Sequence, residues 1–593
     1  MTRPSCNAAI MAALLASGAL LPAPALAQYA WSDDEVTSSA PASVQGQDGY
    51  GDGYGDDGGD PYGDAYGGSG GSRPSGAPVR QRLRIDPYIE ASQVYTREIQ
   101  PGDADAAYAN VAAGVDASVQ GRRAGGSVSL RYDRVISYGD EIADGDSVSG
   151  VARGYAAVAP GFNVEAGGLA ARTRGNGGGG ATLASGQPID ADNEARVYSA
   201  YAGPTLVTRA GPVDVSAGYL FGYNRVEEPA AGVIGNTADP IDVAAESMVH
   251  SANARVGVDP GDVLPVGVAV GGGAYQEDIS NLDQRVRDFY ARGDVTVPVG
   301  QGLAVVGGVG YEYVEISNRD VVRDGTGAPV IGADGRFQTD ETSPRQIAFE
   351  TEGLIWDVGV VWKPSRRTQF EAHYGRRYDS DTYYGSFGWQ PSSRTAINAS
   401  VYDSVSGFGG TITNGLANLP TSFAASRNAL TGDFTGCVSS TGTEGSTDCF
   451  GGALSSVRGA AFRNRGAQLG YSTTMGRITT GLAVGYDRRS FFGAPGTVLA
   501  AANGVADESY YGNVVLSGPV DAFSGFTVGG YASYLDQGAS ELNDALLLGA
   551  SAAYNRTLYR NLSARAAVSV DTIESDVVDE TNASALVGLR YDF

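Results

Sequence analysis

The chain has 593 residues and a formal net charge of −26, and it contains 86 Gly, 33 Tyr and only 4 Met. The acidic balance argues against a nucleic-acid partner, because binding phosphate groups requires a basic surface. Abundant turn-forming Gly together with aromatic Tyr favours a β-rich chain over a helical one.

The first residues follow the order of charged, apolar and small residues that is typical of a secretory signal peptide. Arg3 precedes an apolar run from Ala8 to Leu21, and a small-residue site ends at Ala27. The run is shorter than the roughly 20 residues of a spanning helix. We therefore expect residues 1–27 to be a signal peptide. No later stretch predicts a spanning helix, so the mature chain can meet a membrane only as strands.

Residues 28–82 repeat Gly, Asp and Tyr with almost no aliphatic side chains. Such a segment cannot bury enough apolar surface to fold alone, and we expect a disordered periplasmic linker. It is also too short and too polar to be the folded plug that ligand-gated active transporters carry, which argues against that class.

From Leu83 to Phe593 the sequence alternates apolar and polar residues in segments of 10 to 17 residues. Typical soluble strands have about five or six residues, whereas roughly 9 to 11 are needed to cross a bilayer. An open sheet edge in hydrocarbon would leave backbone groups unpaired, so the strands must close. We expect an all-β fold over residues 83–593, a transmembrane antiparallel up-and-down β-barrel. One outward face carries Leu354, Trp356, Val358, Val360 and Trp362.

The connections give the number of strands. Short turns are expected near Gly121, Pro160, Gly211, Pro260, Gly300, Pro364, Pro391, Gly476, Pro519 and Leu558. Longer loops are expected near residues 98–105, 177–192, 226–240, 318–346, 408–458 and 490–505, with shorter ones between them. Ten turns and eleven loops predict about 22 strands. A count of roughly 16 to 22 is compatible, because segments between Asn318 and Ile347 could be hairpins within a loop.

The last strand alternates to the final residue, and Leu589, Tyr591 and Phe593 resemble the terminal signal that the barrel assembly machinery recognises. Together with the signal peptide, this places the chain in the outer membrane of a Gram-negative bacterium. The expected partners are outer-membrane lipid, lipopolysaccharide and the assembly machinery. The sequence leaves the oligomeric state open.

Few residues in the sequence are candidates for a disulfide, a catalytic or metal site, or a charged lining of the lumen. Cys437 and Cys449 are the two cysteines left after processing, and they fit one disulfide formed in an oxidising compartment. His373 beside Glu371 is better explained as a polar residue of the lumen than as a catalytic base, so we expect no enzyme, no cofactor and no metal site. Charged residues expected to line the lumen are Arg131, Asp133, Glu371, His373, Arg377, Asp487, Arg565, Asp571 and Arg590. They could brace the wall as ion pairs or select a charged solute.

One short sequence motif occurs twice, at Trp362–Thr368 and at Trp389–Thr395. It predicts two turns on the periplasmic side. With Gly375–Tyr378 and Tyr384–Phe387 between them, residues 348–410 resemble the exosortase-system-associated (PEP-CTERM-associated) outer-membrane barrels. The resemblance implies association with surface polysaccharide or an exosortase system. Similar proteins are sometimes labelled as a preprotein translocase auxiliary subunit, but that subunit is a small protein with a spanning helix, which this sequence lacks.

Three functions are compatible with these observations. The first is an envelope-associated barrel that assists surface polysaccharide export, the second a porin-like diffusion channel for small solutes, and the third a structural barrel that displays surface loops such as Cys437–Cys449.

Overall fold

The structure is a computed structural model that describes residues 82–102, 104–121, 123–139, 142, 144–175, 181–183, 194–227, 241–440, 447–450, 453–454, 456–538, 544–575 and 579–593. The expected signal peptide and, apart from Arg82, the expected linker lie outside the described residues.

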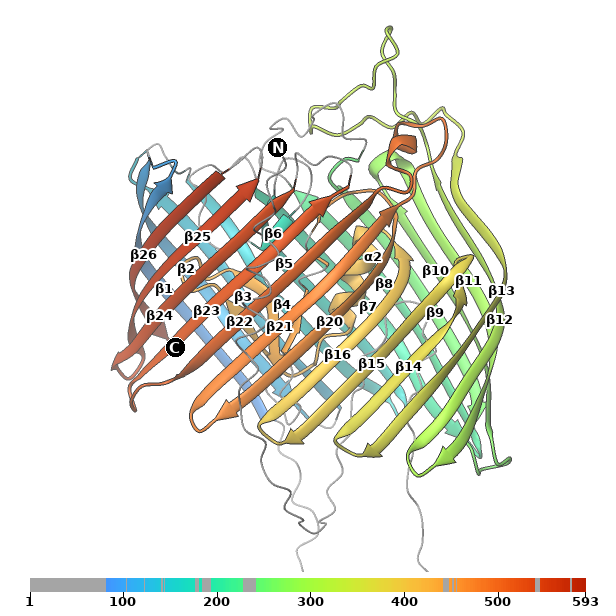
Figure 1. The fold of residues 1–593 in the computed structure, drawn as a ribbon. Coiled ribbons are helices and arrows are strands. Elements are labelled where there is room, and N and C mark those ends of the chain that lie inside the picture. The colour runs from blue at the N-terminus through green and yellow to red at the C-terminus, as the bar shows by residue number, and fades with distance from the viewer. Residues whose placement is uncertain are drawn as a thin grey trace, which may run out of the picture. The chain divides into compact units, whose positions relative to one another are not determined.

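Within the described residues, 22 antiparallel strands form one closed barrel, as the alternation predicts (Figure 1). Each wall strand pairs with the next along the chain, and the last strand, β26, pairs with the first, β1, from Tyr88↔Asp592 to Gln100↔Thr581. Strands β1 to β12 of the wall are Arg82–Gln100, Asp105–Gln120, Ala124–Ser137, Gly145–Ala159, Phe162–Gly175, Glu194–Ala210 (β7), Val213–Glu227, Glu246–Val258, Gly267–Ile279, Gln284–Gly300 and Leu303–Asn318. The remaining wall strands are β13 to β16 (Gln346–Ser365, Thr368–Arg377, Ser380–Ser392, Thr395–Ser406) and β20 to β26 (Phe462–Met475, Ile478–Phe491, Ala506–Pro519, Ser524–Gln537, Ala545–Tyr559, Leu562–Ser575, Asp579–Asp592).

The positions of the ten short turns are confirmed, since each predicted residue lies in a connection between two wall strands, or within two residues of it, at one end of the barrel. The start of β1 and the end of β26 lie at this end too, as an even number of strands requires. In bacterial outer-membrane barrels the short turns face the periplasm. The opposite, loop end carries the segment 319–345, in which the bridges Val321↔Thr339 and Ile331↔Phe337 form a small hairpin outside the wall.

The two faces of the wall differ as the period of two predicts. On the outer face Val358, Val360 and Trp362 are exposed, and on the inner face Asp357 is buried. A closed barrel whose outer face carries an apolar belt is the β-structure that hydrocarbon admits, because closure pairs the last strand with the first. The protein is therefore an outer-membrane β-barrel.

The remaining described elements are short. They comprise β6 (Ala181–Leu183), α2 (Phe408–Ala417), the three-stranded sheet β17–β19 (Phe423–Arg427, Phe434–Ser440, Thr447–Cys449) and the 3-10 helices η2 (Asn281–Asp283) and η3 (Val498–Ala502). No helix within the described residues is long and apolar enough to cross a membrane.

The segment between β16 and β20 corrects the sequence analysis, which expects residues 408–458 to be a surface loop. The described residues of this segment (407–440, 447–450, 453–454 and 456–461) fold back into the barrel, and Figure 1 shows α2 within the ring of strands. We call this segment the lumen insert. Its apolar side chains explain the difference, since the inside of the barrel covers them and solvent would not.

Candidate functional site

The lumen insert contacts wall strands on several sides of the barrel. Helix α2 packs against β5, β7, β8, β9, β10 and β16, while β17 contacts β3, β18 contacts β4 and β5, and β19 contacts β20 and β21. A short segment can reach strands so widely spaced around the ring only from the inside. The insert therefore crosses the lumen.

An apolar core joins the insert to the wall. Phe408, Ile412 and Leu416 form one face of α2, and they pack in a single buried cluster with Val151 and Val197 of the inner wall. The spacing of four residues places the three side chains of α2 on one face of the helix. The same cluster contains, from the sheet of the insert and the segment that follows it, Phe423, Phe434, Val438, Phe450, Leu454 and Val457.

Glu277 of β10 fixes the N-terminus of α2. Its carboxylate, 0% exposed, accepts hydrogen bonds from the backbone N–H groups of Gly407 at 2.6 Å and Gly410 at 3.0 Å. It also accepts hydrogen bonds from the hydroxyls of Ser247 at 2.8 Å and Tyr275 at 2.6 Å. A negative charge at this position satisfies N–H groups that a helix leaves unpaired and interacts favourably with the helix dipole.

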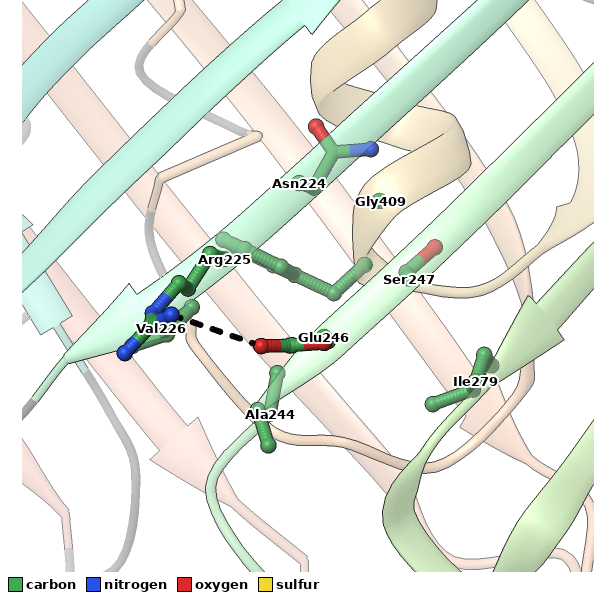
Figure 2. A pocket seen from close by; sticks show the side chains of 10 residues that line it. Asn224, Arg225, Val226, Ala244, Glu246, Ser247, Ile279 and Gly409 are labelled. Atoms are coloured by element: carbon green, nitrogen blue, oxygen red, sulfur yellow. Dashed lines mark ion pairs between the residues drawn. The ribbon is translucent and has the colours of Figure 1, made fainter.

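Glycines allow the helix end to approach the wall this closely. A Cβ on Gly410 would lie 2.0 Å from Oη of Tyr275, and one on Gly409 would lie 2.2 Å from Oγ of Ser247. Figure 2 shows Gly409 facing Ser247 and Asn224. These three residues and Ile279 line a small pocket between α2 and the wall. A larger residue at either position therefore requires α2 or the facing wall side chain to move.

Three arginines, of which Arg172 is buried and Arg427 and Arg565 are half-buried, also join the insert to the wall. Arg172 of β5 forms an ion pair with Asp433 of the insert, with both side chains at most 5% exposed. Arg427 of the insert donates to Oγ of Ser129 at 2.9 Å and of Ser149 at 3.3 Å, on β3 and β4. Arg565 of β25 donates to the carbonyl oxygen of Ala429.

The end of the insert is fixed in the same way before the chain enters β20. Arg458, 0% exposed, lies 3.4 Å from the carboxylate of Asp507 and donates to Oε1 of Gln537 at 2.9 Å. Arg489 of β21 donates to the carbonyl oxygens of Ser456 at 2.8 Å and Ala453 at 3.1 Å. Both ends and the middle of the insert are thus bound to the wall.

The disulfide expected between Cys437 and Cys449 is present, and it joins β18 to β19 within the insert. Cys437 is 6% exposed, so the disulfide braces the segment in the lumen rather than a displayed loop.

The charged residues expected in the lumen lie on the inner face in several separate groups. Arg131 pairs with Asp133 at 2.9 Å and with Glu90 at 3.0 Å, and Arg565 reaches the same Glu90 at 3.5 Å. These residues adjoin the insert, because a Cβ on Gly432 would lie 2.4 Å from the Arg131 guanidinium.

The other members of this set lie elsewhere on the wall. His373 hydrogen-bonds to Glu371 at 2.9 Å and Asp357 at 3.2 Å, and its ring stacks on Tyr384. The remaining contacts are Arg377 with Asp288 and Glu312, Asp487 with Tyr402, Asp571 with Ser569 and Tyr531, and Arg590 with Asp592 and the ring of Tyr88. The assembly-signal residues Leu589, Tyr591 and Phe593 are exposed on the outer face.

The inner face is not covered everywhere. Toward the turn end of β14, β16 and β20, the inward residues Glu371, Asn398 and Ser400 are half-buried, and Gln468 is exposed. The insert therefore leaves a polar part of the wall accessible.

Sequence reasoning missed Glu277 and the glycines that it contacts. A signal for the helix was present, since Phe408, Ile412 and Leu416 recur every fourth residue. Its docking site was not predictable, because Glu277 and Gly407 are 130 positions apart in the sequence.

Comparisons with known proteins find solved structures that are similar to the chain at low sequence identity. The chain matches the FrpB iron transporter from Neisseria meningitidis (11% identity, TM-score 0.40) over 86% of this chain and 82% of that one. It matches the ferric-catecholate import receptor Fiu from E. coli K12 (10% identity, TM-score 0.42) over 86% and 82%. The siderophore receptor PirA from Acinetobacter baumannii gives 9% identity and a TM-score of 0.39 over 86% and 81%. No protein-family model and no curated protein matches the chain.

Proposed function

We propose that the protein is a gated conduit of the outer membrane, closed in this conformation by the lumen insert. The observation that carries the proposal is that the described elements of the insert, α2 and β17–β19, lie across the lumen and contact strands on several of its sides. The apolar core around Phe408 and the buried pair of Arg172 with Asp433 stabilise this arrangement.

The docked insert favours this function over the alternatives. A porin-like diffusion channel needs a water-filled path, whereas here a packed segment crosses the lumen. Display of the Cys437–Cys449 segment on the surface would need the insert to leave its apolar contacts. Assistance to polysaccharide export or to an exosortase system rests on the sequence resemblance of residues 348–410 alone.

Conductance of the refolded protein in planar bilayers tests the proposal. Wild type should be closed for most of the time, and Gly410→Val should conduct more often, because the added side chain collides with Tyr275 and Glu277. Gly512→Ala is the matched control, since its Cβ would lie 3.6 Å from the nearest atom, an ordinary contact. Steady conductance of wild type equal to that of Gly410→Val would refute gating by the insert.

Two further measurements separate gating from damage to the barrel. Heat-modifiable migration in gels reports whether each variant is folded. Removal of residues 28–81 should leave wild-type conductance unchanged if the insert, and not the N-terminal segment, closes the lumen.

A further inference from the structure

The wall has an open strand edge at its loop end. Strand β13 begins at Gln346, but its pairing with β14 begins only at Trp356, which lies opposite Arg376. The hairpin of β14 and β15 turns back directly after Arg377. Residues 346–355 therefore pair with β12 on one side, and on the other side they pair with no strand of the described chain.

This edge is accessible and able to form hydrogen bonds. Glu350, Glu352 and Leu354 are exposed, and a Cβ on Gly353 would meet no atom within 4 Å. The segment contains no proline, so each residue has an N–H group. In an antiparallel strand alternate residues point their N–H and C=O groups to each side, and an unpaired row is a template for another strand.

The opposite border of the gap is different. Residues 403–406 of β16 also extend beyond their pairing with β15, which ends at Val401, but they are buried. Arg463 and Arg465 of β20 cross this border and donate to the carbonyl oxygen of Asp381, at 3.2 and 2.7 Å. Only the β13 border is open to a new strand.

The outer face of the edge carries the exposed carboxylates of Glu350 and Glu352, and because a charge in hydrocarbon is unfavourable, this part of the edge belongs on the water side of the membrane interface. Trp356 and Tyr374, whose rings are 6.4 Å apart, mark an aromatic position at the top of the shared β13–β14 region. Residues 346–355 continue from there toward the loop end, so a water-soluble chain can reach them.

The side chains around the edge define what would bind. Glu350 and Glu352 project from the outer face two residues apart, whereas the ring of Phe349 packs at a tilt against that of Phe492 behind the edge, with the ring centroids 4.9 Å apart. Opposite charges across neighbouring strands are favourable. We propose that residues 346–355 of β13 bind an extended polypeptide in which basic residues alternate with apolar ones, by addition of a strand. This inference does not depend on gating by the insert.

A labelled peptide of four Lys-Val repeats, blocked at both ends, is the probe, and the full-length protein in uncharged lipid nanodiscs is the target. Fluorescence anisotropy should show saturable binding, and a Glu-Val peptide should not bind. The double variant Glu350→Lys, Glu352→Lys should bind the Lys-Val peptide about tenfold more weakly and should bind the Glu-Val peptide.

Glu574→Lys is the matched control, because Glu574 is exposed near the same end of the barrel on a strand that is paired on both sides. The affinity of this variant for the Lys-Val peptide should equal that of wild type.

Backbone pairing has its own test. N-methylation of alternate residues removes the N–H groups along one edge of the peptide, so one methylated set should abolish binding and the other should not. Hydrogen exchange should slow at residues 346–355 when the peptide binds. Equal binding of both methylated sets, equal loss in Glu574→Lys, or no saturable binding to wild type would overturn the proposal. So would a dimer that dissociates in the Glu350→Lys, Glu352→Lys variant, since the edge would then belong to a second copy.

Discussion

Glu277 accepts hydrogen bonds from two hydroxyls and two backbone N–H groups, all of them buried. In Glu277→Gln an N–H₂ group would face these donors, and an unpaired buried donor costs about 1–3 kcal/mol. We expect amide exchange in α2 to become faster while exchange in the wall strands stays unchanged, as measured by mass spectrometry. Ser247→Ala removes only one of the four donors and should have a smaller effect. Unchanged exchange of α2 in Glu277→Gln would show that this carboxylate does not hold the insert.

Asp283 anchors the long loop 319–345 at the loop end, through Arg319 at 2.7 Å and Arg345 at 2.6 Å. Burial acts to raise the pKa of Asp283, but the hydrogen bonds from Arg319 and Arg345 outweigh it and lower the pKa below the ordinary value. A lowered pKa means that the contribution of these pairs is complete above about pH 4 and is lost as the pH falls through the lowered value. Pepsin should therefore cut the loop faster only in strong acid, after correction for its own pH profile. Asp283→Asn should show no such pH dependence, and an identical profile in both proteins would contradict the assignment.

At the scale of strands, many glycines have a role other than forming turns. Tyrosines on the inner face lie over glycines directly opposite on the neighbouring strand, and a Cβ there would lie less than 3 Å from the ring. The pairs are Tyr88↔Gly114, Tyr155↔Gly125, Tyr201↔Gly167, Tyr290↔Gly273, Tyr402↔Gly466, Tyr511↔Gly485 and Tyr531↔Gly549. This pairing accounts for part of the abundance of both residues in the sequence.

One such pair can be tested against a neighbour on the same two strands. Gly485→Val would place its Cβ 2.2 Å from the Tyr511 ring, whereas Gly512→Ala meets its nearest atom at 3.6 Å. Overpacking a close contact typically costs about 1–3 kcal/mol. We expect Gly485→Val to lower the temperature at which the barrel loses its heat-modifiable migration and Gly512→Ala to leave it unchanged. Equal transition temperatures would show that the ring moves aside without cost.

The wall was predictable from the sequence because its pattern is local. Alternation and turn residues such as Gly121 and Pro364 fix the strands and the ten short turns. The position of the insert in the lumen was not predictable. Its short elements lack the long alternation of apolar and polar residues that marks a wall strand, so the sequence predicts a loop there. Contacts such as Arg172 with Asp433 join residues 261 positions apart, and only the closed barrel brings them together.

At the scale of the whole molecule, the barrel is so wide that its lumen can be blocked only by an additional segment such as the insert. A wall of 22 strands encloses more space than its own inward side chains can fill. The lumen must therefore hold water or a folded segment. In this protein the segment comes from between two wall strands, although the sequence analysis considered only the N-terminal residues as a candidate plug.

The geometry of the wall allows the insert to be removed without changing the strands. Ser406 and Phe462, which flank it, already lie opposite each other on β16 and β20, so an Asn-Gly turn can join them. We expect the barrel without residues 407–461 to fold with reduced thermal stability, because Val151 and Val197 lose their apolar partners. Its conductance should be steady and exceed that of Gly410→Val, in which the insert remains in the chain. A folded but silent barrel would mean that a different part of the chain closes the lumen, and removal of residues 28–81 from the same variant would identify it.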